Sequence, residues 1–228
     1  MKNIVFLSAS PKINEQSVSK EFLDMAGNRI DAETFNKIFI DVRRSLSSHK
    51  LAENFETLAK ADVMIISFPL YVFCLPGILM RFLQDYYNYY IGSSCANITV
   101  KVYAIVNCGF PEPEINLEAV RVIKSFTQHI HGEFRFGVLI GAGPMMIAAK
   151  EAPFMKKTAQ TLSDAFSSIS DDIKQGHVTK TNDINIGVNF PFSRRLYLFF
   201  GGRGWVTSAR KNGLQKTDLY KKPYRLNE

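Results

Sequence analysis

Hydroxyl groups and a lysine gather in one short segment near the start of the chain, residues 8–19. The segment offers the hydroxyls of Ser10, Ser17 and Ser19 beside Lys12, and it leads into a stretch with helical spacing. Serine hydroxyls and the unpaired N–H groups of a helix start together form an anion site. The segment matches neither G-x-G-x-x-G nor G-x-x-x-x-G-K-[ST], so it favours one terminal phosphate over a dinucleotide or a nucleoside triphosphate. A plain turn with an N-cap serine explains the same residues equally well.

A run of apolar and aromatic residues, 69–76, follows the most apolar stretch of the chain. If that stretch is a strand, side chains exposed at its carboxyl end can pack along a flat conjugated ring. The residues of this kind are Pro69, Leu70, Tyr71 and Val72. Taken alone, the run is explained better by packing in the core or in a dimer interface.

A third segment, Asn107-Cys108-Gly109, follows another apolar run. A glycine directly after a strand lets backbone amides approach a ligand closely, and a plain turn is the alternative. Cys108 has no histidine in a recognisable partner motif, which argues against a nucleophilic thiol.

These three segments are positioned by alternating strands and helices. Short apolar runs predict five strands, at residues 2–8, 37–42, 62–68, 100–107 and 134–140. Apolar residues at helical spacing predict helices at residues 17–29, 51–59, 76–90, 120–130 and 162–173. Continuous apolar strands are typical of a parallel sheet that is covered on both faces. The pattern predicts an α/β three-layer sandwich of the flavodoxin-like fold, with a five-stranded parallel sheet of order 2-1-3-4-5. In that topology the loops after the first, third and fourth strands meet at the ligand site.

Charge divides the chain into a neutral part and a basic part. Residues 189–228 hold nine Lys/Arg and two Asp/Glu, whereas residues 1–188 hold 19 of each sign. We therefore predict a ligand-binding domain over residues 1–175 and a basic C-terminal extension over residues 176–228. Arginines and aromatic residues alternate in the extension, which suits an anionic lipid surface or nucleic acid. Aromatic packing against the domain, with the charges in water, is the favoured alternative.

Several classes of protein are disfavoured by the residues present. Three cysteines without metal-type spacing argue against a disulfide framework, a zinc site and an iron–sulfur cluster, and they favour a reducing, cytoplasmic environment. Residues 63–80 carry no charge, but Pro69, Pro76 and Gly77 divide them, so we expect no transmembrane segment. The apolar run at the chain start is too short for a signal peptide.

Together the segments resemble the NAD(P)H-dependent FMN reductases and flavodoxin-like quinone reductases, over roughly residues 1–150. Ser10-Pro11-Lys12 followed by Ser17-Val18-Ser19 is similar to the phosphate loop of that family, with Ala9 and Lys12 where glycine and arginine are common. Residues 61–72, 75–77 and 81–83 resemble its second signature. The resemblance implies FMN contacts in three groups. The phosphate loop would be Ser10, Lys12, Gln16, Ser17, Val18 and Ser19; the ring wall Pro69, Leu70, Tyr71 and Val72; and the polar ring edge or ribityl contact Asn107, Cys108 and Gly109.

The same resemblance implies an FMN-dependent oxidoreductase and a homodimer. NAD(P)H would pass a hydride to bound FMN, and a quinone, azo, nitro or flavin compound would take the electrons from the same face. No acid or base residue is required. A flavodoxin-type electron carrier and a non-enzymatic flavin-binding protein with a surface-binding tail are the alternatives. We expect no nucleic-acid partner, and at most weak contact of the tail with a membrane surface.

Overall fold

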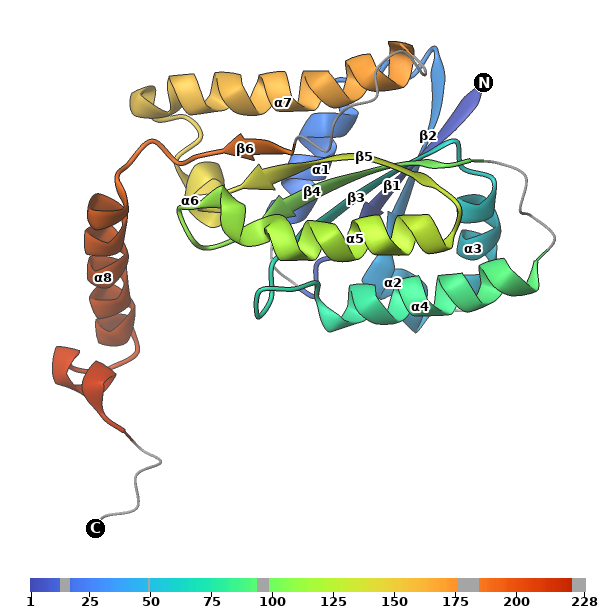
Figure 1. The fold of residues 1–228 in the computed structure, drawn as a ribbon. Helices are drawn as coiled ribbons and strands as arrows, with labels where there is room; N and C mark the ends of the chain where they lie inside the picture. Colours follow the sequence, from blue (N-terminus) through green and yellow to red (C-terminus); the bar gives the residue numbers. More distant parts are fainter. Residues whose placement is uncertain (13–16, 49, 94–98, 176–184, 223–228) are drawn as a thin grey trace. The chain divides into compact units, whose positions relative to one another are not determined.

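Six parallel strands form one sheet in the computed structural model, which describes residues 1–12, 17–48, 50–93, 99–175 and 185–222 (Figure 1). The strand order is β2-β1-β3-β4-β5-β6. The strands are β1 (Lys2–Ser8), β2 (Phe35–Asp41), β3 (Val63–Pro69), β4 (Lys101–Asn107), β5 (Glu133–Ile140) and β6 (Ile186–Val188). The first five confirm the order 2-1-3-4-5 that the sequence predicts, which is the flavodoxin-like order.

The sixth strand is a difference from the five-stranded prediction. β6 pairs with the end of β5, from Val138↔Ile186 to Ile140↔Val188. The side chain of Asn185 secures its start by accepting a 2.7 Å hydrogen bond from the N–H of Gly137. Three residues are too few to show the alternation that marks a strand in a sequence, so only pairing with β5 reveals it.

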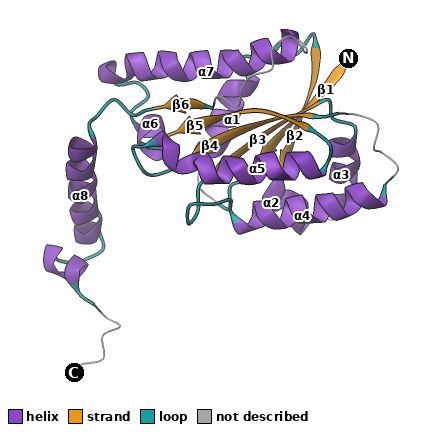
Figure 2. Ribbon diagram, in the orientation of Figure 1, coloured by secondary structure: helices purple, strands orange, loops and turns teal. Residues whose placement is uncertain are grey.

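Helices cover both faces of the sheet (Figures 1 and 2). They are α1 (Val18–Gly27), α2 (Val42–Ser47), α3 (Leu51–Ala59), α4 (Gly77–Gly92), α5 (Leu117–His129), α6 (Gly143–Ala148) and α7 (Lys156–Gln175), with 3-10 turns at Pro113–Asn116 and Pro153–Met155. α1 and α7 lie on one face, and α3, α4 and α5 on the other. β3 and β4 are buried along nearly their whole length, as their apolar sequences predict.

Two short helices begin where the sequence suggests strand ends and turns. The predicted second strand runs to Val42, but the structure ends β2 at Asp41, whose side chain caps α2 by accepting a 2.8 Å hydrogen bond from the N–H of Arg44. Gly143-Pro144 starts α6. Proline suits a first helical turn because the N–H that it lacks would have no helical partner there.

A buried ion pair joins α7 to the amino end of the sheet. The guanidinium of Arg135 on β5 donates to both carboxylate oxygens of Asp172 at 2.6 and 2.8 Å, and it also contacts Glu133. The hydroxyl of Tyr103 on β4 donates to Asp172 at 2.6 Å. Burial raises the pKa of Tyr103 well above its ordinary value, so the phenol keeps this proton. The network lies near the amino ends of β4 and β5. The three segments that the sequence predicts to contact a ligand follow the carboxyl ends of their strands, at the opposite edge of the sheet.

The chain divides into two compact units, Met1–Phe190 and Pro191–Glu228. The first unit extends beyond residue 175, where the sequence suggests a boundary, because β6 belongs to the sheet. The second unit contains helix α8 (Arg194–Lys211), which the sequence analysis does not predict, and a 3-10 turn at Lys216–Tyr220. Within the described parts of both units, no helix combines the length and the hydropathy needed to cross a bilayer.

Candidate functional site

The loops after β1, β3 and β4 meet at the carboxyl edge of the sheet, around a cleft of about 260 Å³. The cleft is lined by Ser10, Lys12, Val18, Ser19, Pro69, Leu70, Tyr71, Asn107, Cys108, Gly109 and Pro144. All but Pro144 are residues for which the sequence predicts ligand contact. β1 and β3 are neighbours, and the chain leaves them toward opposite sides of the sheet, so the cleft lies at the topological switch point where this fold binds ligands.

Hydrogen bonds between the loops hold the cleft open. The N–H of Ala9 donates to the carbonyl of Ser67 at 2.9 Å, which ties the β1 loop to β3. The N–H of Leu70 donates to the carbonyl of Asn107 at 2.8 Å. The side chain of Asn107, which is buried, donates to the carbonyl of Phe68 at 3.3 Å. Asn107 therefore joins the β3 and β4 loops, and its side-chain amide N–H already donates to the carbonyl of Phe68.

The loop after β5 supports the β4 loop from behind. The N–H of Ala142 donates to the carbonyl of Phe110 at 2.6 Å, and the N–H of Gly143 donates to the carbonyl of Cys108 at 2.9 Å. A Cβ on Gly141 would lie 2.3 Å from the carbonyl oxygen of Pro111. This close approach of two backbones requires glycine. The sequence shows the glycine-rich turn but not its partner, and for the same reason it misses Pro144.

We predict that Gly141→Ala displaces the β4 loop and weakens the binding of FMN, the ligand that the sequence resemblance implies. The clash is with backbone and not with a movable side chain end, so the loop must shift, at a cost of about 1–3 kcal/mol in folding stability. FMN titration by fluorescence quenching and thermal unfolding measure the two effects. Gly92→Ala is the matched control, because Gly92 lies at the end of α4 outside the cleft, and a Cβ there meets no atom within 4 Å beyond its own helix. Equal FMN affinity in the Gly141 variant and the native chain would contradict the prediction.

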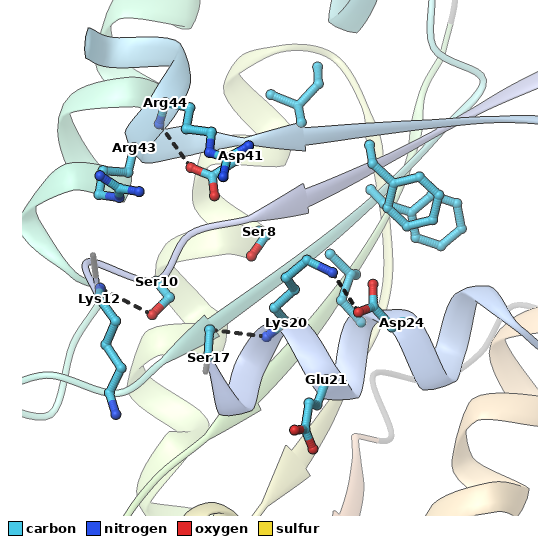
Figure 3. A pocket seen from close by; sticks show the side chains of 14 residues that line it. Ser8, Ser10, Lys12, Ser17, Lys20, Glu21, Asp24, Asp41, Arg43 and Arg44 are labelled. Carbon is cyan, nitrogen blue, oxygen red and sulfur yellow. Dashed lines mark hydrogen bonds and ion pairs between the residues drawn. The ribbon is translucent and has the colours of Figure 1, made fainter. Parts of the chain in front are cut away.

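The amino end of α1 opens into a second cavity, of about 670 Å³, which shares Ser10 and Lys12 with the cleft. Figure 3 shows the serine hydroxyls of this region at the end of β1 and the start of α1. Ser17 is the N-cap of α1: its hydroxyl accepts a 3.2 Å hydrogen bond from the N–H of Lys20 and lies 3.2 Å from the hydroxyl of Ser19. Ser17 lines this second cavity, not the cleft, and Gln16 lies outside the described residues.

Charged side chains that the sequence analysis does not single out also line the second cavity (Figure 3). The cationic ones beyond Lys12 are Lys20, Arg43 and Arg44, and the acidic ones are Glu21, Asp24 and Asp41. Lys20 pairs with Asp24 at 2.6 Å, and Asp41 caps α2. The Nε of Arg43 is buried with no hydrogen-bond partner among the described residues. The position of Arg43, two residues after the end of β2, a strand next to β1, is the signal that could have identified it.

The β3 loop forms a tight hairpin at the mouth of the cleft. Tyr71 and Cys74 exchange two backbone hydrogen bonds of 2.9 Å. Val72 and Phe73, between them, have φ values of 49° and 59°, in the left-handed region that is costly for a β-branched or aromatic residue. Val72 is 93% exposed at the tip and does not line the cleft, unlike the other predicted ring-wall residues. Phe73 stacks on Phe110 with ring centroids 5.8 Å apart.

Cys108 is a buried thiol. Its N–H donates to the carbonyl of Ile140 at 3.1 Å, and its Sγ is 3.4 Å from the carbonyl of Phe110. Burial raises the pKa of the Cys108 thiol above its ordinary value, so the neutral form dominates at pH 7. The thiolate is the nucleophilic form of cysteine, so the geometry favours a wall residue over a nucleophile. Among the described residues, no group of three or more His, Cys, Asp or Glu is placed to hold a metal ion.

No protein-family model and no curated protein matches the chain. Solved structures do match in fold. An NAD(P)H:quinone oxidoreductase from Methanothermobacter marburgensis aligns with a TM-score of 0.57 at 14% identity, over 78% of this chain and 98% of that one. An NADH:FMN oxidoreductase in its apo form aligns with a TM-score of 0.56 at 17% identity, over 86% and 98%.

A third matching structure is a complex with FMN. General stress protein 14 from Treponema denticola, in complex with FMN, aligns with a TM-score of 0.52 at 16% identity, over 75% of this chain and 98% of that one. The aligned shares cover nearly the whole of each of these proteins, so the likeness extends over a complete domain. The chain therefore has the flavodoxin-like fold of these proteins, as its strand order independently shows.

Proposed function

We propose that the chain is an FMN-dependent NAD(P)H oxidoreductase that passes electrons to a small organic acceptor. The observation that carries the proposal is the meeting of a serine-lined helix start with a narrow apolar cleft, through the shared residues Ser10 and Lys12. The three structures described above, two of them oxidoreductases and one an FMN complex, support it by fold. The role of each residue in binding FMN remains a prediction.

The residues around the start of α1 fit a monophosphate. Ser10, Ser17 and Ser19 supply hydroxyls, and the first turn of α1 supplies backbone N–H groups with the positive end of the helix dipole. Lys12 adds a positive charge on the side toward the cleft. The oxygens of a phosphate accept hydrogen bonds from hydroxyl and N–H donors of this kind. Because the phosphate is charged, these hydrogen bonds are stronger than hydrogen bonds between neutral groups.

The cleft fits one face and one edge of a flat ring system. Pro69, Leu70 and Tyr71 form its apolar side, and Asn107 to Gly109 form its polar side. A bound FMN would supply the redox chemistry, which is hydride transfer from a nicotinamide and electron delivery to an acceptor. The residues of the cleft would orient the ring and shield one of its faces from water, and both substrates would react in turn at the other face. The stacked pair Phe73–Phe110, with both rings about half exposed, favours planar acceptors such as quinones or azo compounds.

The test uses the purified full-length chain with FMN, NADH or NADPH, and a water-soluble quinone. We expect a yellow protein with one FMN per chain, oxidation of NAD(P)H that depends on the quinone, and parallel double-reciprocal plots, because both substrates use one open face. Failure to bind FMN would overturn the proposal. FMN binding without NAD(P)H oxidation, with any acceptor, would favour the flavodoxin-type carrier instead.

A homodimer and a cytoplasmic location are part of the proposal. The hairpin tip at Val72 and Phe73 is apolar, exposed and conformationally costly, so burial against a second copy would stabilise it. Cys74 and Cys108 are free thiols, which suits a reducing compartment. Sedimentation equilibrium of the native chain and of a Val72→Gly variant tests the dimer.

A further inference from the structure

The C-terminal unit, Pro191–Glu228, has an apolar surface that its own residues leave uncovered. Within α8, Leu198 is 58% exposed, Phe199 55% and Trp205 71%, and only Ala209 is buried. Leu198 and Trp205 are seven residues apart, as are Phe199 and Val206. These four side chains therefore fall on one half of the helix, and the exposed side chains of Leu196 and Phe200 lie on the other half.

Helix α8 is intrinsically weak for its length. It contains Gly201, Gly202 and Gly204, and among the described residues no atom beyond the neighbouring backbone of the helix lies within 4 Å of a Cβ placed on any of them. Glycine in a helix interior costs about 1 kcal/mol relative to alanine, so three of them remove about 3 kcal/mol. These glycines serve no close packing that the described residues display. A helix of this kind needs an external surface to stabilise it.

Charge identifies the kind of surface. From Pro191 to Lys222 the chain has eight Lys/Arg and a single acidic residue, Asp218. Asp218 is engaged with Lys221 at 2.7 Å and with the N–H of Gln215. The unit therefore presents seven more positive than negative charges beside its apolar side chains, which is complementary to an anionic apolar surface.

A groove of about 520 Å³ between α8 and the 3-10 turn combines both features. Its walls are lined by Leu198, Phe199, Gly202, Arg203, Val206, Thr207, Arg210, Lys216 and Tyr220. Three cations thus border an apolar floor, and the guanidinium of Arg203 lies 5.4 Å from the ring centre of Phe199. An anionic headgroup with an apolar chain matches this arrangement, whereas a free phosphate would use only its rim.

We infer that the C-terminal unit binds the surface of bilayers that contain anionic phospholipid. α8 lies in the plane of the interface, with the half that carries Leu198 and Trp205 toward the acyl chains and Arg203 and Arg210 at the headgroups. Binding orders the glycine-rich helix. The inference does not depend on the proposed oxidoreductase activity. If both hold, the flavodoxin-like unit works next to a membrane, where apolar electron acceptors dissolve.

The experiment uses the full-length chain with vesicles of phosphatidylcholine alone or mixed with phosphatidylglycerol. Trp205 is the only tryptophan of the protein, so its fluorescence reports on this unit alone. We expect a blue shift and co-sedimentation with the anionic vesicles, neither with the neutral ones, and reversal of binding at high salt.

Two paired variants separate the charge from its location. Each basic residue near an anionic surface contributes about a five-fold gain in partitioning, so Arg203→Gln with Arg210→Gln should weaken binding about 30-fold. Lys60→Gln with Lys157→Gln removes the same charge from exposed positions of the other unit and should change binding less than three-fold by the same reasoning. Equal losses in the two pairs would overturn the inference.

Other occupants of the surface give different results, and each would overturn it. Trp205 emission that is already blue-shifted and unchanged by vesicles would mean that protein covers the helix. Tighter binding to single-stranded RNA than to anionic vesicles, lost in the Arg203/Arg210 pair, would mean a nucleic-acid site. Absence of binding to any vesicle would end the lipid account.

Discussion

Replacing Ser17 with aspartate is expected to abolish FMN binding while leaving the apoprotein at least as stable as the native chain. Aspartate is as good an N-cap as serine, and its charge interacts favourably with the helix dipole. The same charge repels a phosphate bound at the start of α1. Two like charges about 4 Å apart near a protein surface repel by about 4 kcal/mol, which raises the Kd for FMN about 1,000-fold. Isothermal titration with FMN and thermal unfolding of the apoprotein measure both effects.

Ser17→Asn is the matched control, because asparagine caps a helix equally well without the charge. It should weaken FMN binding by no more than about ten-fold, the share of one lost hydroxyl contact. In the aspartate variant, FMN affinity should fall while the stability of the apoprotein does not. A general disruption of the fold would lower both, so this combination points to repulsion of the phosphate. If Ser17→Asp binds FMN as tightly as Ser17→Asn does, then the phosphate is not held at the start of α1, and the proposed site is wrong.

Asp172→Ala is expected to produce the largest loss of stability of any single change discussed. The substitution leaves Arg135, with a 4% exposed side chain, and the hydroxyl of Tyr103 without their shared acceptor. Removing one partner of a buried pair costs about 3–5 kcal/mol, and the remaining contact with Glu133 places this case near the lower end. For a chain of this size that lowers Tm by about 10 °C. Thermal and urea unfolding measure it.

Asp171→Ala is the control, because Asp171 is its exposed neighbour on α7. We expect a change within about 0.5 kcal/mol there. The double variant Arg135→Met with Asp172→Leu should recover much of the loss, since an apolar pair avoids the cost of a lone buried charge. A single Asp172 variant as stable as the Asp171 variant would show that the ion pair does not anchor α7.

The stabilising effect of Asp172 should also depend on pH. Burial raises the pKa of this carboxyl, but the hydrogen bonds from Arg135 and Tyr103 outweigh burial, so the folded-state pKa lies below its ordinary value. A group with a depressed pKa stabilises the fold above its unfolded-state pKa and loses this effect as the pH falls through its folded-state pKa. The stability difference between the native chain and Asp172→Ala should therefore be full at neutral pH and shrink below about pH 4.

The sequence by itself determined the first five strands of the sheet and the edge at which three loops meet. Apolar runs separated by helical stripes identified β1 to β5, because a parallel sheet that is covered on both faces requires them. The switch-point rule then brought three distant loops to one edge, where ten of the predicted residues line the cleft. The strand order and the convergence of the loops could be predicted because they rest on periodicity and topology, which depend on residue types along the chain, whereas the role of each residue in binding FMN stays a prediction.

Only the tertiary structure decided the features that depend on contacts between distant segments. β6 becomes a strand by pairing with β5, and Gly141 is required because the backbone of Pro111 approaches it from another loop. The exposure of Val72 follows from the hairpin that Tyr71 and Cys74 close. The pairing of Arg135 with Asp172 joins residues 37 positions apart, and no local pattern of charges indicates it. In each case the stabilising interaction arises only when two distant segments meet. The sequence of either segment alone therefore does not predict the feature.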